Sequence, residues 1–97
     1  MDKEQQMLEE AAELLRTISH PARLCIIKRL LDEEPCNVTY LQNCMGLPQS
    51  TLSTHLQKLR SANIVTAKRN GLEVFYVIHN EKVKQLIPIL FSHESIL

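Results

Sequence analysis

Hydrophobic residues recur every three or four positions through the first two thirds of the chain, which is the spacing of one face of an amphipathic helix. The pattern predicts helices over residues 3–19, 21–31, 39–45 and 49–62. Pro21 suits the first position of a helix, and Gly46 suits the position just after one. Because only a tight Gly46-Leu47-Pro48 turn separates the third helix from the fourth, this pair predicts a helix-turn-helix.

The period changes after residue 63. Residues 64–68 and 72–78 read as strands, and Asn70-Gly71 between them is a strong hairpin signal because both residues tolerate positive φ. A last helix is predicted over residues 81–91. The expected fold is therefore mostly α with a small β-hairpin, in the order α-α-α-α-β-β-α. A helix-turn-helix (39–62) followed directly by a hairpin (64–78) is a winged helix, and the 97 residues form one such domain.

The fourth predicted helix has two contrasting faces. Leu52, Leu56 and Leu59 form an apolar stripe that anchors it, so its polar side chains point outward. Capping explains one hydroxyl at a helix start, but this helix has four within five positions. Gln can bond adenine, Ser and Thr can bond several bases, and a Thr methyl can contact thymine. We expect major-groove contacts from Gln49, Ser50, Thr51, Ser53 and Thr54, with Lys58 on the DNA backbone.

The formal net charge is zero, but the charges are unevenly distributed. Eight of the eleven acidic residues lie within residues 1–13 and 32–34, whereas residues 35–72 contain no acid and four basic residues. Lys68, Arg69 and Asn70 fall at the tip of the predicted wing, which suits contact with phosphates or the adjacent minor groove; a solvated turn is the alternative. His55 fits either a phosphate contact or packing beside Leu56.

Three ordered motifs carry a resemblance to a known family. They are "HPARLCIIKRLL", "LPQSTLSTHLQKLRSANIV" and "KRNGLEVFYVI", and together they resemble the ArsR/SmtB family of bacterial winged-helix repressors. The resemblance extends from residue 14 to about residue 90. It implies a transcriptional repressor that binds imperfect palindromes in double-stranded DNA. Where the family often has Gly before the first wing strand this chain has Asn63, which also tolerates the left-handed conformation.

The resemblance also implies a homodimer joined through the first and last helices, residues 3–19 and 81–91. The sequence favours this independently, because the last helix is apolar on more than one side and so small a domain has a marginal core. The alternative is that this helix wraps its own core. Pro88 inside the helix predicts a kink or an early end. The expected interface residues are Leu8, Ala11, Leu15, Val83, Leu86, Ile87, Leu90 and Phe91.

Many members of the family sense metals, but the ligands are largely absent here. Where the family has a thiolate site with the sequence Cys-Val-Cys, this chain has Asn37-Val38-Thr39. At the positions of the family's last-helix site it has Asn80, Lys82, His93 and Ile96, of which only His93 could be a ligand. We expect no metal and no cofactor. These replacements, with the Pro-Gln-Ser-Thr helix start and the Gly-Leu-Glu wing, most resemble a PagR-like subgroup that represses without the usual metal site.

Cysteine content leaves a second possibility open. Cys25, Cys36 and Cys44 are an odd number in a chain without a signal peptide or membrane-length apolar run, so a cytoplasmic protein with free thiols is expected. A Cys36–Cys44 or intersubunit disulfide would instead give a redox-responsive repressor. A further alternative is a winged-helix protein-interaction module without DNA binding. No catalytic arrangement or small-molecule site is recognisable, so an enzyme is not expected.

Overall fold

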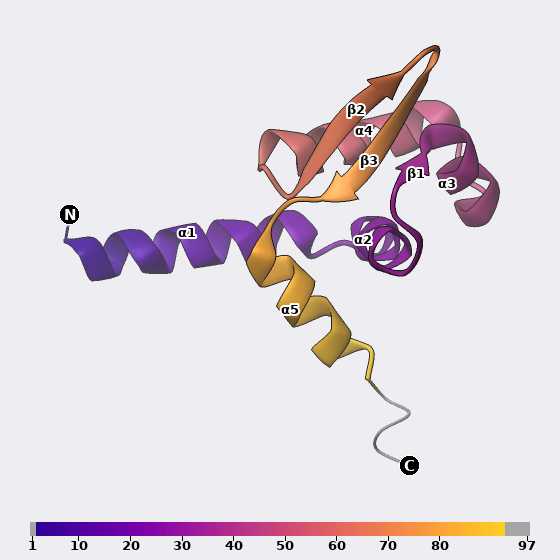
Figure 1. Ribbon diagram of the computed structural model, residues 1–97. Helices are drawn as coiled ribbons and strands as arrows, with labels where there is room; N and C mark the ends of the chain where they lie inside the picture. Colours follow the sequence, from indigo (N-terminus) through magenta and orange to yellow (C-terminus); the bar gives the residue numbers. More distant parts are fainter. Residues whose placement is uncertain (1, 93–97) are drawn as a thin grey trace.

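The computed structural model describes residues 2–92, which form five helices and a three-stranded antiparallel sheet (Figure 1). The elements in chain order are α1 (Lys3–Ile18), α2 (Pro21–Glu33), β1 (Cys36–Asn37), α3 (Val38–Met45), α4 (Gln49–Ser61), β2 (Val65–Asn70), β3 (Glu73–Ile78) and α5 (Glu81–Leu90). Every element expected from the sequence is confirmed, with ends that differ by at most two residues. The short strand β1 was not expected.

Polar side chains at the helix starts explain where the helices begin. Asp2 Oδ1 accepts the Gln5 N–H at 2.7 Å before α1, and Asn80 Oδ1 accepts the Val83 N–H at 3.0 Å before α5. His20 Nδ1 accepts the Ala22 N–H at 3.0 Å before α2, where Pro21 follows at the first helical position. Each cap satisfies a backbone donor that the helix leaves without a partner.

Two residues with positive φ end the helices of the helix-turn-helix. Gly46 (φ 66°) follows α3, and Asn63 (φ 59°) follows α4, as expected for a residue that tolerates the left-handed region. After α4, the Ile64 N–H donates to Leu59 O and the Asn63 N–H donates to Arg60 O, both at 3.0 Å. This is a Schellman motif. Ile64 O also accepts the N–H groups of His79 and Asn80, so this one residue joins the end of α4 to the start of α5.

The wing is the β2–β3 hairpin, and its turn differs from the expected one. Asn70 pairs with Glu73, so the loop consists of Gly71 and Leu72 rather than Asn70-Gly71. Within this loop only Gly71 has positive φ (67°), which is the pattern of a type II′ turn with glycine first. Asn70 is the last residue of β2, and the tolerance of positive φ that it shares with Gly71 is used at Gly71 only.

The sheet order is β1-β3-β2, so the two residues of β1 extend the wing on its second edge. Cys36 pairs with Tyr76 and Asn37 with Phe75. Two residues are too few to show a strand period, which is why the sequence did not reveal β1.

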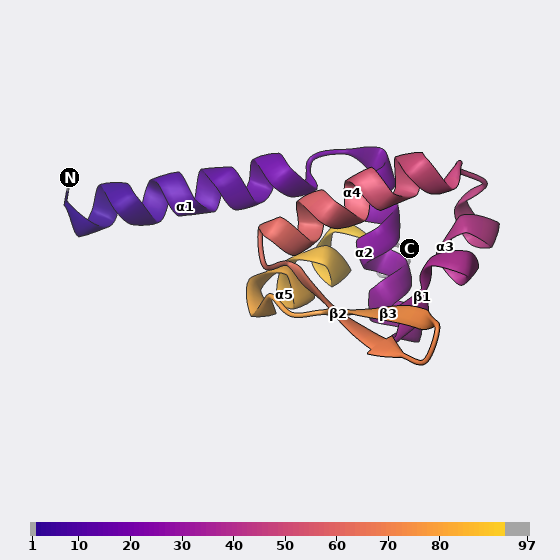
Figure 2. The same cartoon turned by 90° about the horizontal axis from the view of Figure 1, so that it is seen from above.

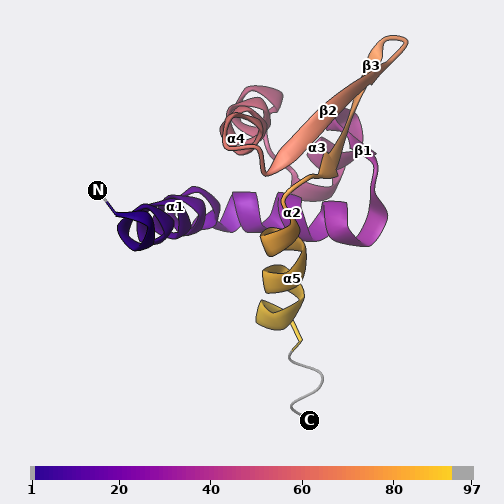
Figure 3. The same cartoon turned by 60° about the vertical axis from the view of Figure 1, so that its left-hand side comes forward.

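The elements project in different directions from a small body. Helix α1 extends well beyond the other elements (Figures 1 and 2). Helix α5 points away from α4 and the wing, which lie together on the opposite side (Figure 3). A kink or an early end was expected at Pro88; α5 continues through Pro88 to Leu90, so the helix does not end at the proline.

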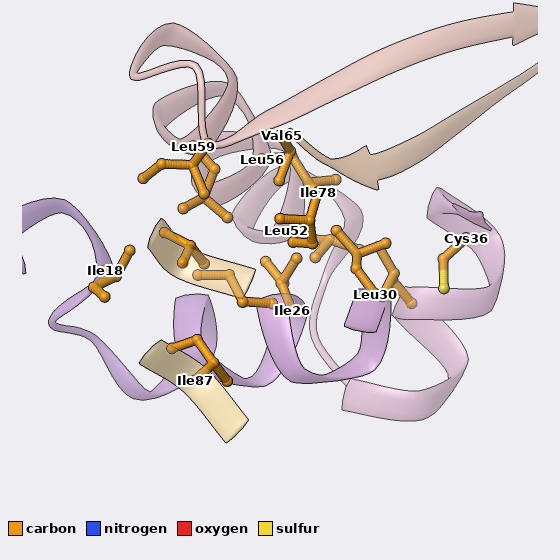
Figure 4. Packing of buried hydrophobic residues seen from close by; sticks show 14 residues of the cluster. Ile18, Ile26, Leu30, Cys36, Leu52, Leu56, Leu59, Val65, Ile78 and Ile87 are labelled. Atoms are coloured by element: carbon orange, nitrogen blue, oxygen red, sulfur yellow. The ribbon is translucent and has the colours of Figure 1, made fainter. Parts of the chain in front are cut away.

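The core lies between α2, α4, α5 and the base of the sheet (Figure 4). Its members are aliphatic apart from one cysteine: Ile18, Ile26, Ile27, Leu30, Cys36, Leu41, Leu52, Leu56, Leu59, Ile64, Val65, Ile78, Val83 and Ile87. Leu52, Leu56 and Leu59 confirm the apolar stripe expected on α4. Helix α1 contributes only Ile18 to this set, so most of its length has little packing within the chain.

Candidate nucleic-acid interface

The outer face of α4 is polar and open to solvent. The buried leucines fix the helix on the body, and the side chains opposite them are exposed: Gln49, Ser50, Thr51, Ser53, Thr54, Gln57 and Lys58. The five polar residues expected at the start of the helix are therefore brought together on one surface. Gln57 was not among the expected contacts, although its position one turn after Ser53 could have indicated it.

The hydroxyls at the start of α4 do not cap the helix. Pro48 precedes the first turn, and within residues 2–92 no side chain caps the start of this helix through a hydrogen bond. Capping therefore does not account for these residues. The hydroxyl of Thr54 is already engaged, because its Oγ1 donates a hydrogen bond to Ser50 O at 3.0 Å. Its methyl group and oxygen lone pairs remain for a ligand.

His55 is a residue of α4 whose half-buried side chain lies against the start of α2. Its Nδ1 accepts a hydrogen bond from Arg23 Nε at 3.2 Å, and its ring lies 4.5 Å from the His20 ring, centroid to centroid. Burial, followed by the charges of His20 and Arg23, lowers the pKa of His55 below its ordinary value. Arg23 Nη1 also donates to Thr17 O at 2.8 Å, so this cluster braces α4 against α1 and α2. Packing is thus the visible role of His55, and its DNA contact stays a prediction.

The part that His20 and Arg23 play in holding α4 was not expected from the sequence. The signal was present in the His-Pro-x-Arg motif, whose first and last residues both reach His55.

The tip of the wing is basic and exposed. Lys68, Arg69 and Asn70 end β2, and Leu72 in the loop is 98% exposed. Within residues 2–92 the ion pairs join Glu13 to Arg16, Lys28 to Asp32 and Glu81 to Lys84, so none of them neutralises a cation of the wing or of α4. Lys58, Lys68 and Arg69 are therefore available to an anionic partner such as DNA.

The cysteines are free thiols in unequal environments. Cys36 is buried, and its thiol donates to Glu33 O at 3.2 Å. Burial and then the neighbouring Glu33 carboxylate raise the pKa of the Cys36 thiol, which suppresses the reactive thiolate. Cys25 and Cys44 are half-buried.

Two residues at positions matched to metal ligands of the family cap helices in this chain. Asn37 Oδ1 accepts the Tyr40 N–H at 2.7 Å and caps α3, while Asn80 caps α5. Lys82 is exposed, and His93 and Ile96 lie outside the described residues. Among residues 2–92, no three side chains of His, Cys, Asp or Glu converge as an ion would require.

The residues expected at the dimer interface fall into two groups. Leu8, Ala11, Leu15 and Leu90 are exposed, and Leu86 and Phe91 are half-buried. Val83 and Ile87 are buried in the core of the single chain, where they hold α5 in place. Met7 and Ile89 are also exposed and enlarge the apolar surface of α1 and α5.

An exposed polar helix after a tight turn, beside a basic hairpin, defines a winged helix-turn-helix DNA-binding domain. The chain belongs to the ArsR family of bacterial regulatory proteins, whose sequence profile, "Bacterial regulatory protein, arsR family", matches residues 20–67. It is 45% identical over 83 residues to the transcriptional repressor PagR of Bacillus anthracis, covering 86% of this chain and 83% of that one. A biofilm growth-associated repressor of Xylella fastidiosa is 39% identical over 83 residues, with 86% and 72% covered.

Solved structures agree with these matches. The crystal structure of PagR superimposes with a TM-score of 0.81 at 43% identity, covering 89% of this chain and 98% of that one. A homodimeric winged helix-turn-helix domain from Mycobacterium bovis, described as a possible ArsR-family regulator, gives a TM-score of 0.84 at 25% identity, covering 98% and 87%. The resemblance inferred from the sequence motifs is confirmed, and the chain is a transcription regulator rather than an enzyme. Within residues 2–92, no helix has the length and apolarity needed to cross a membrane.

Proposed function

We propose that this protein is a homodimeric transcriptional repressor that binds a palindromic operator in double-stranded DNA. The observation that carries the proposal is the outer face of α4, on which exposed hydrogen-bonding side chains gather without a single acid. The repressor function of two relatives, PagR and the Xylella fastidiosa protein, supports it. Its site of action is the cytoplasm, where bacterial DNA lies.

In this proposal α4 reads bases and the wing holds the backbone. Gln49 at the start of α4 can bond adenine at two atoms, and the exposed Ser50 and Ser53 hydroxyls can donate or accept. Lys58, Lys68 and Arg69 neutralise phosphates, so binding should weaken steeply as salt rises. The wing therefore contributes affinity, whereas α4 contributes sequence preference.

A second copy of the chain covers the apolar surface of α1 and α5. Leu8 is 64% exposed, Leu15 is 51% exposed and Leu90 is 55% exposed. Large apolar side chains left exposed on two helices indicate an interaction surface, and the homodimeric domain from Mycobacterium bovis supports the assignment. A twofold dimer places two α4 helices about one DNA turn apart, which is the geometry that a palindrome requires.

The repressor works without a resident metal or cofactor. Asn37 and Asn80 serve as caps at positions where metal-sensing relatives are expected to carry ligands. An amide is a poor substitute for thiolate with soft ions, so zinc or cadmium should not release the DNA.

The test is a titration of the purified protein, by fluorescence anisotropy, into DNA from its own promoter and into a scrambled duplex. It is carried out with reductant, with oxidant, and with zinc or cadmium added. Selective binding that ignores metal and oxidant is the expected result. Selective binding that zinc or oxidant abolishes would contradict the metal- and thiol-independent part, and equal binding to both duplexes would contradict the operator.

A further inference from the structure

Asn37 uses both ends of its amide at once. Its Oδ1 accepts the Tyr40 N–H at 2.7 Å and starts α3, and its Nδ2 donates to Glu73 Oε1 at 3.0 Å. One side chain therefore links the first turn of the helix-turn-helix to the beginning of β3. Because Asn37 also pairs with Phe75 through β1, its backbone position is fixed on the sheet.

Glu73 occupies an unusual place for an acid. It is the only Asp or Glu between residues 35 and 80, and it pairs with Asn70 at the basic tip of the wing. A carboxylate facing DNA would repel phosphate. The hydrogen bond to Asn37 instead holds it toward α3.

The bond joins the wing to the start of α3, the first helix of the helix-turn-helix. A groove there is lined by Asn37 and Gln42 on one side, Gln49 at the start of α4, and Leu72 and Glu73 of the wing. β1 supports β3 only at Phe75 and Tyr76. The turn side of Phe75 comprises residues 69–74. Within the described residues 2–92, the Asn37–Glu73 bond is the only side-chain hydrogen bond that joins this part of the wing to the helix-turn-helix.

We propose that Asn37 and Glu73 are positioning residues that fix the wing tip at a set distance from α4, so that both elements engage one DNA duplex together. This inference rests on the proposed function, because the benefit of a fixed distance is realised on DNA. Neither residue needs to touch the DNA. Their effect is to lower the ordering cost that a free hairpin would otherwise meet on binding.

The test uses a donor–acceptor exchange. Asn37→Asp keeps an oxygen for the α3 cap but removes the donor and places a second carboxylate opposite Glu73. Asn37→Asp combined with Glu73→Gln restores the bond with its direction reversed, because the Gln amide can donate to the new carboxylate on α3. The exchanged pair carries the same net charge as the original pair, so it is the matched control for charge.

Operator affinity is measured for these variants with and without Arg69→Ala, because Arg69 pairs with Val74 in the part of the wing that β1 does not reach. We expect Asn37→Asp to weaken binding about fivefold, the effect of losing one hydrogen bond. We also expect Arg69→Ala to cost clearly less in the Asn37→Asp background than in the native one, because the wing tip that carries the arginine is no longer held in place. The exchanged pair should restore both the affinity and the cost of Arg69→Ala. Equal costs of Arg69→Ala in both backgrounds, or no recovery in the exchanged pair, would overturn the proposal.

Amide hydrogen exchange of the free protein separates this inference from the proposed function. Asn37→Asp and Glu73→Ala, the second of which leaves the α3 cap untouched, should both speed exchange at the wing tip, and the exchanged pair should restore it. Unchanged exchange at residues 68–74 in both variants would overturn the proposal. If the native protein bound no DNA selectively, the proposed function would fail while this measurement still reported on the bond.

Discussion

The surface made by α4 and the wing and the surface made by α1 and α5 are both exposed, but with opposite chemistry. The first presents hydroxyls, amides and unpaired cations, and the second presents leucine, isoleucine and methionine. Water forms hydrogen bonds with the polar groups of the first surface, so these side chains can remain exposed until a ligand binds them. Water forms no such bonds with the apolar side chains of the second surface, so their exposure indicates that another surface covers them.

Helices α4 and α1 also differ in how much of each is buried in the core. Helix α4 is fixed by three fully or almost fully buried leucines, whereas Ile18 is the only buried residue of α1. The buried leucines fix the position of α4 within the single chain, as the proposed base contacts require. In the proposed dimer α1 gains most of its packing from the second copy, so we expect dimerisation to matter more to affinity than any one base contact.

The largest effect should come from charge placed on the apolar surface. Leu8→Glu with Leu15→Glu should separate the dimer and weaken operator binding about 100-fold, because two linked half-site contacts become independent. Analytical ultracentrifugation and anisotropy measure the two losses. Gln5→Glu with Gln6→Glu adds the same two charges at exposed polar positions of α1 and should change neither. A double variant that is monomeric but binds the operator with full affinity would contradict the dimer model.

Base contacts should give the next effect. Gln49→Ala should cost about 1–3 kcal/mol of discrimination at a particular base pair, seen by competition with single-substitution operators. Thr54 offers a sharper comparison, because its hydroxyl already donates to Ser50 O. Thr54→Val retains a methyl and should preserve a thymine contact that Thr54→Ala loses. Equal losses in the Val and Ala variants would show that the hydroxyl, not the methyl, is read.

Wing cations should give a smaller and uniform effect. Lys68→Ala or Arg69→Ala should weaken operator and scrambled DNA alike and reduce the slope of log affinity against log salt by about 1. Titrations at several salt concentrations provide the slope. A change in sequence preference would instead mean that the wing reads bases.

The smallest effect concerns pH and stability. The pKa of His55 is lowered from its ordinary value of 6.5 by burial and by the charges of His20 and Arg23. Below about pH 6.5 the unfolded chain binds the proton more readily than the folded one, so the free energy of unfolding should decrease as pH falls through this window. Urea unfolding at several pH values measures the decrease. His55→Gln should lessen the pH dependence, and an unaltered dependence would place its origin elsewhere.

The sequence was sufficient for the five helices and the hairpin because each has a local signal, which the two-residue strand β1 lacks. Pro21, Gly46 and Asn63 mark helix ends through their own backbone preferences, and three leucines mark the inner side of α4. It was sufficient for the exposed residues of the DNA-binding surface for the same reason, since facing follows from helical spacing.

What the sequence did not reveal depends on residues far apart in the chain. Asn37 meets Glu73 across 36 positions, and Arg23 meets His55 across 32. Neither contact leaves a periodic pattern. The burial of Val83 and Ile87 was likewise hidden, because a helix that is apolar on more than one side does not show which of these sides faces its own core.

The junction at Ile64 has a consequence for how the protein melts and responds. Its N–H closes the end of α4, its carbonyl oxygen receives the start of α5, and its side chain is buried. We therefore expect the end of α4 and the start of α5 to open together, as one cooperative unit in hydrogen exchange. In the proposed dimer, a second copy bound at α5 would then slow the opening of α4 with no change of shape. The concentration of the protein would in this way influence how much of it is ready for DNA.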